Sequence, residues 1–200
     1  MLRLEDFETV FVLASLVGAL LVASPALFFV FPSRAGERFS ELYVLGPGRM
    51  AEGYPFNVKA NETCKIFLGV CNHMGSSAYY AVYLKFRNQV EPLPNSTAGT
   101  SSPLPSLYEY RVLLSDGGTW EAPLNFSLVG VSFSGNSCFV ESLRINGVVS
   151  HVGKAGLWDS ENGGFFFQLF FELWVYDPVS GGFLFHDRFV GIWLNVTYVD

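Results

Sequence analysis

Side chains that could carry acid–base, nucleophilic or metal chemistry are few in this chain and widely spaced. The three histidines, His73, His151 and His186, fall on separate expected turns or strands, without a carboxylate or cysteine at the spacing of a metal-ligand motif. The sequence has no H-E-x-x-H, G-x-S-x-G or C-x-x-C motif, and no glycine-rich phosphate loop that opens a helix. We therefore predict no catalytic residue, no metal and no cofactor, and a protein that is not an enzyme.

The three cysteines restrict which disulfides can form. Cys64 and Cys71 lie on one expected strand, which separates them by roughly 23 Å and turns them to opposite faces. A disulfide within the chain must then join Cys138 to Cys64 or to Cys71. The remaining thiol would be free, buried or bonded to another chain.

Four sites carry the N-x-Ser/Thr pattern for N-linked glycosylation: Asn61, Asn95, Asn125 and Asn195. One such tripeptide is weak evidence, but four together favour an extracytoplasmic glycoprotein that carries N-linked glycans. The formal net charge is −6 and the sequence has no basic patch. Nucleic acid is therefore not an expected partner.

Aromatic residues gather on one face of a predicted C-terminal hairpin, formed by residues 164–176 and 183–198. Because Asn195 belongs to a glycosylation site, its side of the strand should face outward. The aromatic side chains on that side would form a partner surface: Phe166, Phe170, Trp174, Phe189 and Trp193. The alternative is that a loop, such as the proline-rich segment 91–106, covers them.

The element expected to hold the domain in place is an apolar helix near the N-terminus. Residues Val10 to Phe31 form an uncharged run of about 22 residues, which as a helix would span roughly 33 Å. We predict a single-pass transmembrane anchor over residues 1–32. Residues 33–200 would form one domain outside the cell membrane.

The rest of the chain has the pattern of a β protein. Residues 78–87 alternate between apolar and polar side chains, which is typical of a half-buried antiparallel strand. Further strands are expected at 65–71, 107–114, 119–128 and 139–145, besides the two strands of the hairpin. About seven or eight strands with regular turns predict a mainly β fold, an immunoglobulin-like antiparallel sandwich behind a single transmembrane helix.

The most specific stretch of sequence is residues 39–55, which read FSELYVLGPGRMAEGYP. Together with the Asn72-His73 turn and the segments 172–176 and 192–197, it resembles an archaeal family of membrane proteins, the domain of unknown function 1616. The resemblance extends over roughly residues 38–198. It implies an archaeal, extracytoplasmic β-sandwich and no particular reaction.

The leading functional hypothesis is a non-enzymatic accessory subunit of an archaeal membrane or cell-surface complex. Its partners would be the membrane and other subunits, which it would bind through the aromatic face. One alternative is a self-assembling filament subunit of the pilin or archaellin type. Another is a carbohydrate-binding surface module that uses Trp and Tyr rings as stacking platforms; a hydrolase has almost no support.

Overall fold

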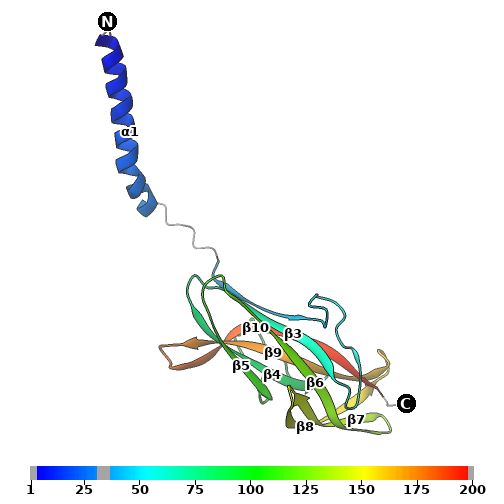
Figure 1. Ribbon diagram of the computed structural model, residues 1–200. Helices are drawn as coiled ribbons and strands as arrows, with labels where there is room; N and C mark the ends of the chain where they lie inside the picture. The colour runs from blue at the N-terminus through cyan, green and yellow to red at the C-terminus, as the bar shows by residue number, and fades with distance from the viewer. Residues whose placement is uncertain (1–3, 31–36, 198–200) are drawn as a thin grey trace. The chain divides into compact units, whose positions relative to one another are not determined.

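The computed structural model describes residues 4–30 and 37–197 (Figure 1). The chain divides into two units, Met1–Arg38 and Phe39–Asp200. The first unit contains helix α1, Leu4–Val30, which confirms a helix where the apolar run predicts one. The predicted boundary between residues 32 and 33 lies outside the described residues.

Helix α1 does not bear out the predicted membrane span. Within the described part of the chain, no helix combines the length and the apolar character that crossing a membrane requires.

The second unit is one curled sheet of ten strands, in the order β1-β3-β6-β7-β8-β9-β10-β2, with β4 on β9 and β5 on β4. All pairs are antiparallel except β10 and β2. The strands are β1 (Phe39–Leu45), β2 (Asn57–Lys59), β3 (Cys64–His73), β4 (Ala78–Asn88), β5 (Tyr108–Leu114), β6 (Thr119–Ser134), β7 (Ser137–Ile145), β8 (Val148–Asp159), β9 (Gly164–Asp177) and β10 (Gly182–Thr197).

Strand β8 joins the two halves of the curled sheet. It pairs with β7 from Val148 to Leu157, and its last residues, Trp158 and Asp159, pair with the start of β9. One half of the sheet thus holds β1, β3, β6, β7 and β8, and the other holds β5, β4, β9, β10 and β2. The turn between β8 and β9 consequently lies where the two halves meet.

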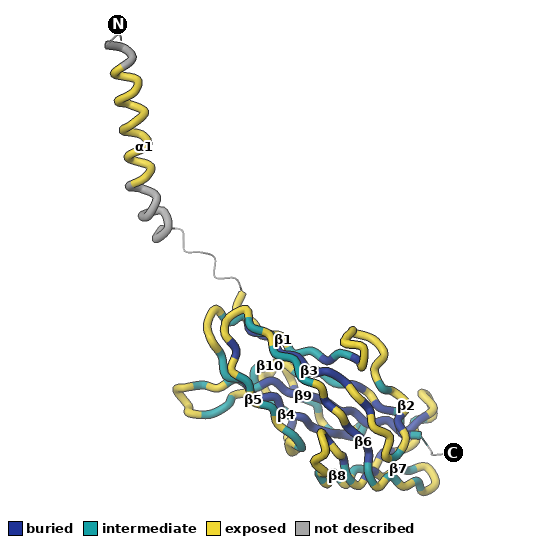
Figure 2. Tube along the Cα trace, in the orientation of Figure 1, coloured by how far each residue is buried: buried dark blue, intermediate teal, exposed yellow. Residues whose placement is uncertain are grey.

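The hydrophobic core draws on both halves of the sheet. It contains apolar residues from β3, β6 and β7 on one side and from β4, β9 and β10 on the other. In β4 the predicted inward face is confirmed, because Tyr80, Val82, Leu84 and Phe86 belong to the core. The strand is not half-buried as predicted, because Lys85 and Arg87 on its other face are buried as well. Strand β9 is buried along most of its length (Figure 2), so both of its faces are covered. The mainly β prediction is therefore confirmed.

All three cysteines are free, so neither predicted disulfide forms. In the strand register, Cys64 of β3 lies opposite Phe126 of β6. Cys138 of β7 lies opposite Phe133, which is seven residues farther along β6. Seven residues of strand cover roughly 23 Å, far beyond the reach of a disulfide. Cys71 pairs with Thr119, at the opposite end of β6 from Cys138.

Candidate functional site

The predicted aromatic surface is smaller than its sequence pattern suggests. Phe170 is fully buried and Phe166 nearly so, and Trp174 and Phe189 are half-buried. Trp193 of β10 alone among the five is exposed, at 40% of its surface. The expectation that all five aromatic side chains are exposed is therefore wrong for Phe166 and Phe170.

The segment between β4 and β5 covers part of this face, as the alternative interpretation of the sequence expected. Its Ser102 is buried, and the Ser102 amide donates to Glu172 Oε1 of β9 over 2.8 Å. The Lys85 ammonium of β4 donates to the Ser102 carbonyl at 2.7 Å and pairs with Glu172 Oε2 at 2.9 Å. The Trp174 indole donates to the same Oε2 at 3.0 Å. A buried, hydrogen-bonded ion pair thus fastens the loop over β4 and β9.

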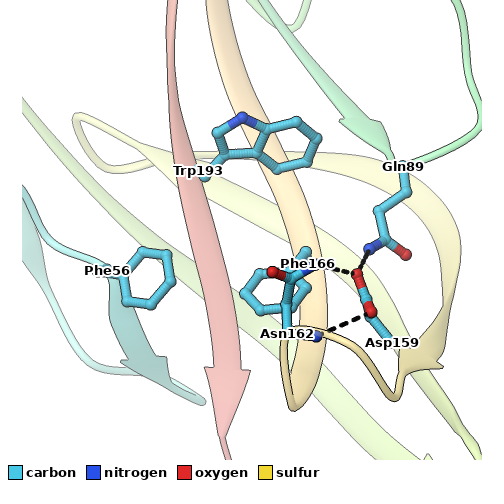
Figure 3. A pocket seen from close by; sticks show the side chains of 6 residues that line it. All are labelled: Phe56, Gln89, Asp159, Asn162, Phe166 and Trp193. Atoms are coloured by element: carbon cyan, nitrogen blue, oxygen red, sulfur yellow. Dashed lines mark hydrogen bonds between the residues drawn. The ribbon is translucent and has the colours of Figure 1, made fainter.

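Beside this loop, two cavities share Trp193 and Phe56 as lining residues. The larger, of about 470 Å³, is also lined by Gln89, Asp159, Asn162 and Phe166 (Figure 3). The smaller, of about 320 Å³, runs along β10 and is lined further by Val44, Tyr54, Pro55, Val190, Gly191 and Ile192. We call the two together the Trp193 groove.

The aromatic wall of the groove comes from three separate segments. Trp193 lies on β10, Phe166 on β9, and Phe56 in the segment before β2 (Figure 3). The rings of Phe56 and Phe166 lie 6.0 Å apart between centroids. Phe56 therefore covers Phe166 and adds its own ring to the groove beside Trp193.

The polar wall is organised around Asp159, at the end of β8. Its Oδ2 accepts hydrogen bonds from Gln89 Nε2 at 3.1 Å and from Asn162 Nδ2 at 2.8 Å. Its Oδ1 accepts from the backbone amides of Glu161 and Asn162. These bonds, those from Asn162 first, lower the pKa of the Asp159 carboxyl. The carboxylate is thus ionised at neutral pH, and it orients two amide side chains along the groove.

Two buried polar side chains lie next to Trp193 in the cross-strand order. Arg87, Gln168 and Trp193 are neighbours across β4, β9 and β10, and the Arg87 guanidinium lies 5.4 Å from the centre of the Trp193 ring. Arg87 also donates to the carbonyls of Gln89 and Glu91. Arg87 Nε and Gln168 Oε1 are buried without a hydrogen-bond partner in the structure. Buried polar atoms without a hydrogen-bond partner are rare in folded proteins, because the free-energy cost of removing them from water is normally offset by a hydrogen bond within the protein.

Apolar and amide side chains line most of the groove. Among the described residues that line its two cavities, Asp159 is the only carboxyl group, and no histidine or cysteine joins it. Hydrolysis of a glycosidic bond generally requires two carboxyl groups that flank the bond, one of them protonated. An aromatic wall with a few convergent polar groups is typical of a pocket that holds a small ligand.

The four glycosylation sites differ in accessibility. Asn61, Asn95 and Asn125 are exposed. Asn195 is half-buried, and its Nδ2, the atom to which a glycan would be attached, donates to Asn57 Oδ1 at 2.9 Å. Its Oδ1 accepts from the Phe165 amide, and a Cβ on Gly164 would lie 2.3 Å from that oxygen. In the folded domain Asn195 therefore has a structural role.

Four residues of the groove were not identified from the sequence: Phe56, Gln89, Asp159 and Asn162. Phe56 follows Tyr54-Pro55, the end of the most specific stretch of sequence, which could have drawn attention to it. The D-x-x-N spacing of Asp159 and Asn162 marks a capped turn, but turns of this kind are common. Gln89 had no signal, because its role depends on contacts 70 residues away.

The sequence model described as "Domain of unknown function (DUF1616)" matches residues 32–132, half of the chain. The chain belongs to the DUF1616 family. This confirms the family resemblance, over a shorter stretch than expected. In this DUF1616 protein the matched part supplies Val44, Tyr54, Pro55, Phe56 and Gln89 to the groove, while Trp193 and Asp159 lie beyond it. No curated protein matches the sequence.

Several solved structures share a distant likeness with this DUF1616 protein. A β-glucosidase from Listeria innocua in complex with gluconolactone is 10% identical, with a TM-score of 0.39; the match covers 82% of this chain and 17% of the enzyme chain. The CARDB domain of a Pyrococcus furiosus protein in complex with di-metal ions is 9% identical, also with a TM-score of 0.39, over 82% of this chain and 97% of that domain. This chain thus spans about a sixth of the length of the enzyme.

Proposed function

We propose that this protein is a non-enzymatic binding module and that the Trp193 groove holds sugar rings of a glycan. The observation that carries the proposal is the combination of the exposed Trp193 ring, next to Phe56, with the amides of Gln89 and Asn162 held by Asp159. Sugar rings present C–H groups on a face and hydroxyl groups around the edge. An aromatic wall beside fixed donors and acceptors complements both.

The shape of the site favours a glycan over a flat protein surface. Of the five aromatic side chains that would have formed a partner surface, two are buried and two half-buried. A stable protein interface buries about 800 Å² on each partner. Two adjoining cavities that share Trp193 and Phe56 instead suit a short chain of small rings.

Replacing Trp193 by alanine is expected to weaken glycan binding at least about 30-fold, because a central aromatic contact typically contributes about 2 kcal/mol or more. A glycan array would first identify the ligand. Binding of the identified oligosaccharide, measured by intrinsic fluorescence and by calorimetry, would then give the affinities of the unaltered protein and of Trp193→Ala.

The matched control is Tyr176→Ala, since Tyr176 on β9 is 39% exposed and lies outside both cavities. It should leave the affinity unchanged. The proposal fails if the array yields no ligand, or if Trp193→Ala binds the ligand as tightly as the unaltered protein does.

A second candidate function is the accessory subunit of an archaeal membrane or cell-surface complex, and helix α1 favours it. Residues 7–21 are all exposed, and large apolar side chains occur on every side of the helix: Phe7, Val10, Phe11, Val12, Leu13, Leu16, Val17, Leu20 and Leu21. A helix that is apolar all round is normally buried against other apolar groups. We propose that α1 packs against other subunits.

Purification of the full chain in mild detergent is expected to retain partner chains in fixed stoichiometry. A variant without residues 1–36 should lose them, while its β domain still binds the ligand of the groove. A monodisperse, partner-free full chain would contradict the subunit function. Recovery of the chain in filaments would point instead to a self-assembling subunit.

An extracytoplasmic location at the cell membrane and an immunoglobulin-like sandwich remain part of this proposal. The asparagines Asn61, Asn95 and Asn125 support the location, because each belongs to a glycosylation tripeptide and is exposed to solvent. The two facing halves of the sheet around one core support the sandwich.

A further inference from the structure

We propose that Glu41, Cys71 and His73 form a binding site for a divalent transition-metal ion of the Zn²⁺ type. The three side chains lie on the outer face of the sheet, Glu41 on β1 and the other two on β3. Their ligand atoms, a carboxylate oxygen, a sulfur and an imidazole nitrogen, all lie within 4.8 Å of one another. This site is separate from the Trp193 groove and does not depend on the function proposed for it.

Strand pairing explains why these three residues meet. Cys71 and His73 are two residues apart on β3, so their side chains point to the same face. In the antiparallel register Glu41 lies directly opposite Cys71, and Phe39 lies opposite His73. Glu41 is therefore a diagonal neighbour of His73, within reach of a long side chain. The sequence interpretation found no ligand spacing around His73 because the third ligand is on another strand.

One pair of ligand atoms already has the spacing of tetrahedral coordination. His73 Nε2 and Glu41 Oε1 are 3.3 Å apart. Two ligand atoms, each about 2.0 Å from a zinc ion, are separated by about 3.3 Å when the angle at the metal is tetrahedral. The nitrogen and oxygen thus already have the spacing they would have around the ion. All three side chains are at least partly exposed, so the sulfur can complete the site without disturbing the core.

Neighbouring side chains support the ligands. The Phe39 ring stacks on the His73 imidazole, with centroids 4.7 Å apart, and this contact orients the imidazole plane. The Thr119 hydroxyl of β6 lies 2.9 Å from Cys71 Sγ, where it can donate to a thiolate. Supporting contacts of this kind are typical of metal sites. With three protein ligands, the fourth position is open to water or to a further ligand.

Cobalt binding tests the site, because Co²⁺ bound to a thiolate absorbs in the near ultraviolet and tetrahedral Co²⁺ absorbs strongly in the visible. Titration of the full-length protein with Co²⁺ near neutral pH should produce both bands, and Zn²⁺ should remove them. Cys71→Ser should abolish the thiolate band. His73→Ala and Glu41→Gln should each weaken Co²⁺ binding at least about 10-fold.

The other two cysteines serve as internal controls. Burial raises the pKa of the Cys64 thiol to about 11 and that of the Cys138 thiol to about 12, so neither provides a thiolate at neutral pH. His151→Ala, at an exposed histidine on β8, should leave Co²⁺ binding unchanged. The proposal is overturned if the thiolate band is absent, if it survives Cys71→Ser, or if His73→Ala and Glu41→Gln bind Co²⁺ as tightly as the unaltered protein. The last result would indicate an isolated surface thiol.

Discussion

Replacing Lys85 by methionine is expected to lower the free energy of unfolding of the β domain by about 3–5 kcal/mol. The Lys85 and Glu172 side chains are only 6% and 0% exposed, and their charged atoms are 2.9 Å apart. Without Lys85, the Glu172 carboxylate would stay buried beside two hydrogen-bond donors but without a counter-charge. The Ser102 carbonyl would also lose the donor that fastens the loop. Equilibrium unfolding in urea would measure the change.

Two further variants separate the buried charge from the loss of packing. Adding Glu172→Gln to Lys85→Met removes the uncompensated charge while keeping an oxygen that can accept from Ser102 or Trp174. More than half of the lost stability should return. The Lys154–Glu91 pair is more exposed than the Lys85–Glu172 pair. Lys154→Met should therefore lower the free energy of unfolding by only about 1 kcal/mol or less. A Lys85→Met variant as stable as the unaltered protein would show that this pair contributes nothing to the fold.

Replacing Asn72 by alanine is expected to cost about 2–4 kcal/mol of unfolding free energy. Asn72 is fully buried at the end of β3, and its amide nitrogen donates to the carbonyls of Ser76, Leu114 and Ser115 at 2.9–3.1 Å. Its side-chain oxygen accepts from the Tyr80 hydroxyl and from the Met74 amide, both at 3.0 Å. Alanine would remove all of these hydrogen bonds at a side chain that is itself fully buried.

An aspartate at the same position provides a sharper test. Asn72→Asp preserves the size but faces three carbonyl oxygens with a carboxylate, so at neutral pH it should be more destabilising than alanine. The control is Asn95→Ala. It removes an exposed side chain whose Oδ1 accepts hydrogen bonds from the Thr97 and Ala98 amides. It should cost less than about 1 kcal/mol. Equal losses in urea unfolding at positions 72 and 95 would contradict the structural role of Asn72.

Most of the strands could be predicted from the sequence, because their apolar residues alternate with a period of two. This holds for β4, with Tyr80, Val82, Leu84 and Phe86 facing inward. The hairpin of β9 and β10 was predicted instead from two long apolar stretches on either side of a glycine-containing turn. Strands β1, β2 and β8 were not predicted. Strand β2 has only three residues, and β8 contains Gly153 and Gly156, which interrupt its pattern. In each case the neighbouring strands, rather than the local sequence, determine the strand.

The predicted partner surface shows that alternation along a strand predicts the side of the sheet on which a residue lies, but not whether that side is exposed. Alternation correctly assigned Phe166, Phe170, Trp174, Phe189 and Trp193 to one side of the hairpin. It could not show that the loop fastened by Lys85 and Glu172 covers part of that side, since this contact joins residues 87 positions apart. What remains uncovered is a groove around Trp193, and the segment before β2 forms part of its wall.

By itself, the sequence determined the apolar N-terminal helix, the mainly β domain and the family to which the chain belongs. These features depend on local periodicity and on short stretches of sequence. Only the tertiary structure decided that the cysteines stay apart, that Asn195 is engaged, and that Trp193 faces Asp159 and Gln89. It also brought Glu41 beside Cys71 and His73. The physical reason is the same in each case: strand register and loop packing place side chains from distant parts of the chain, and neither is encoded in the spacing of residues along one strand.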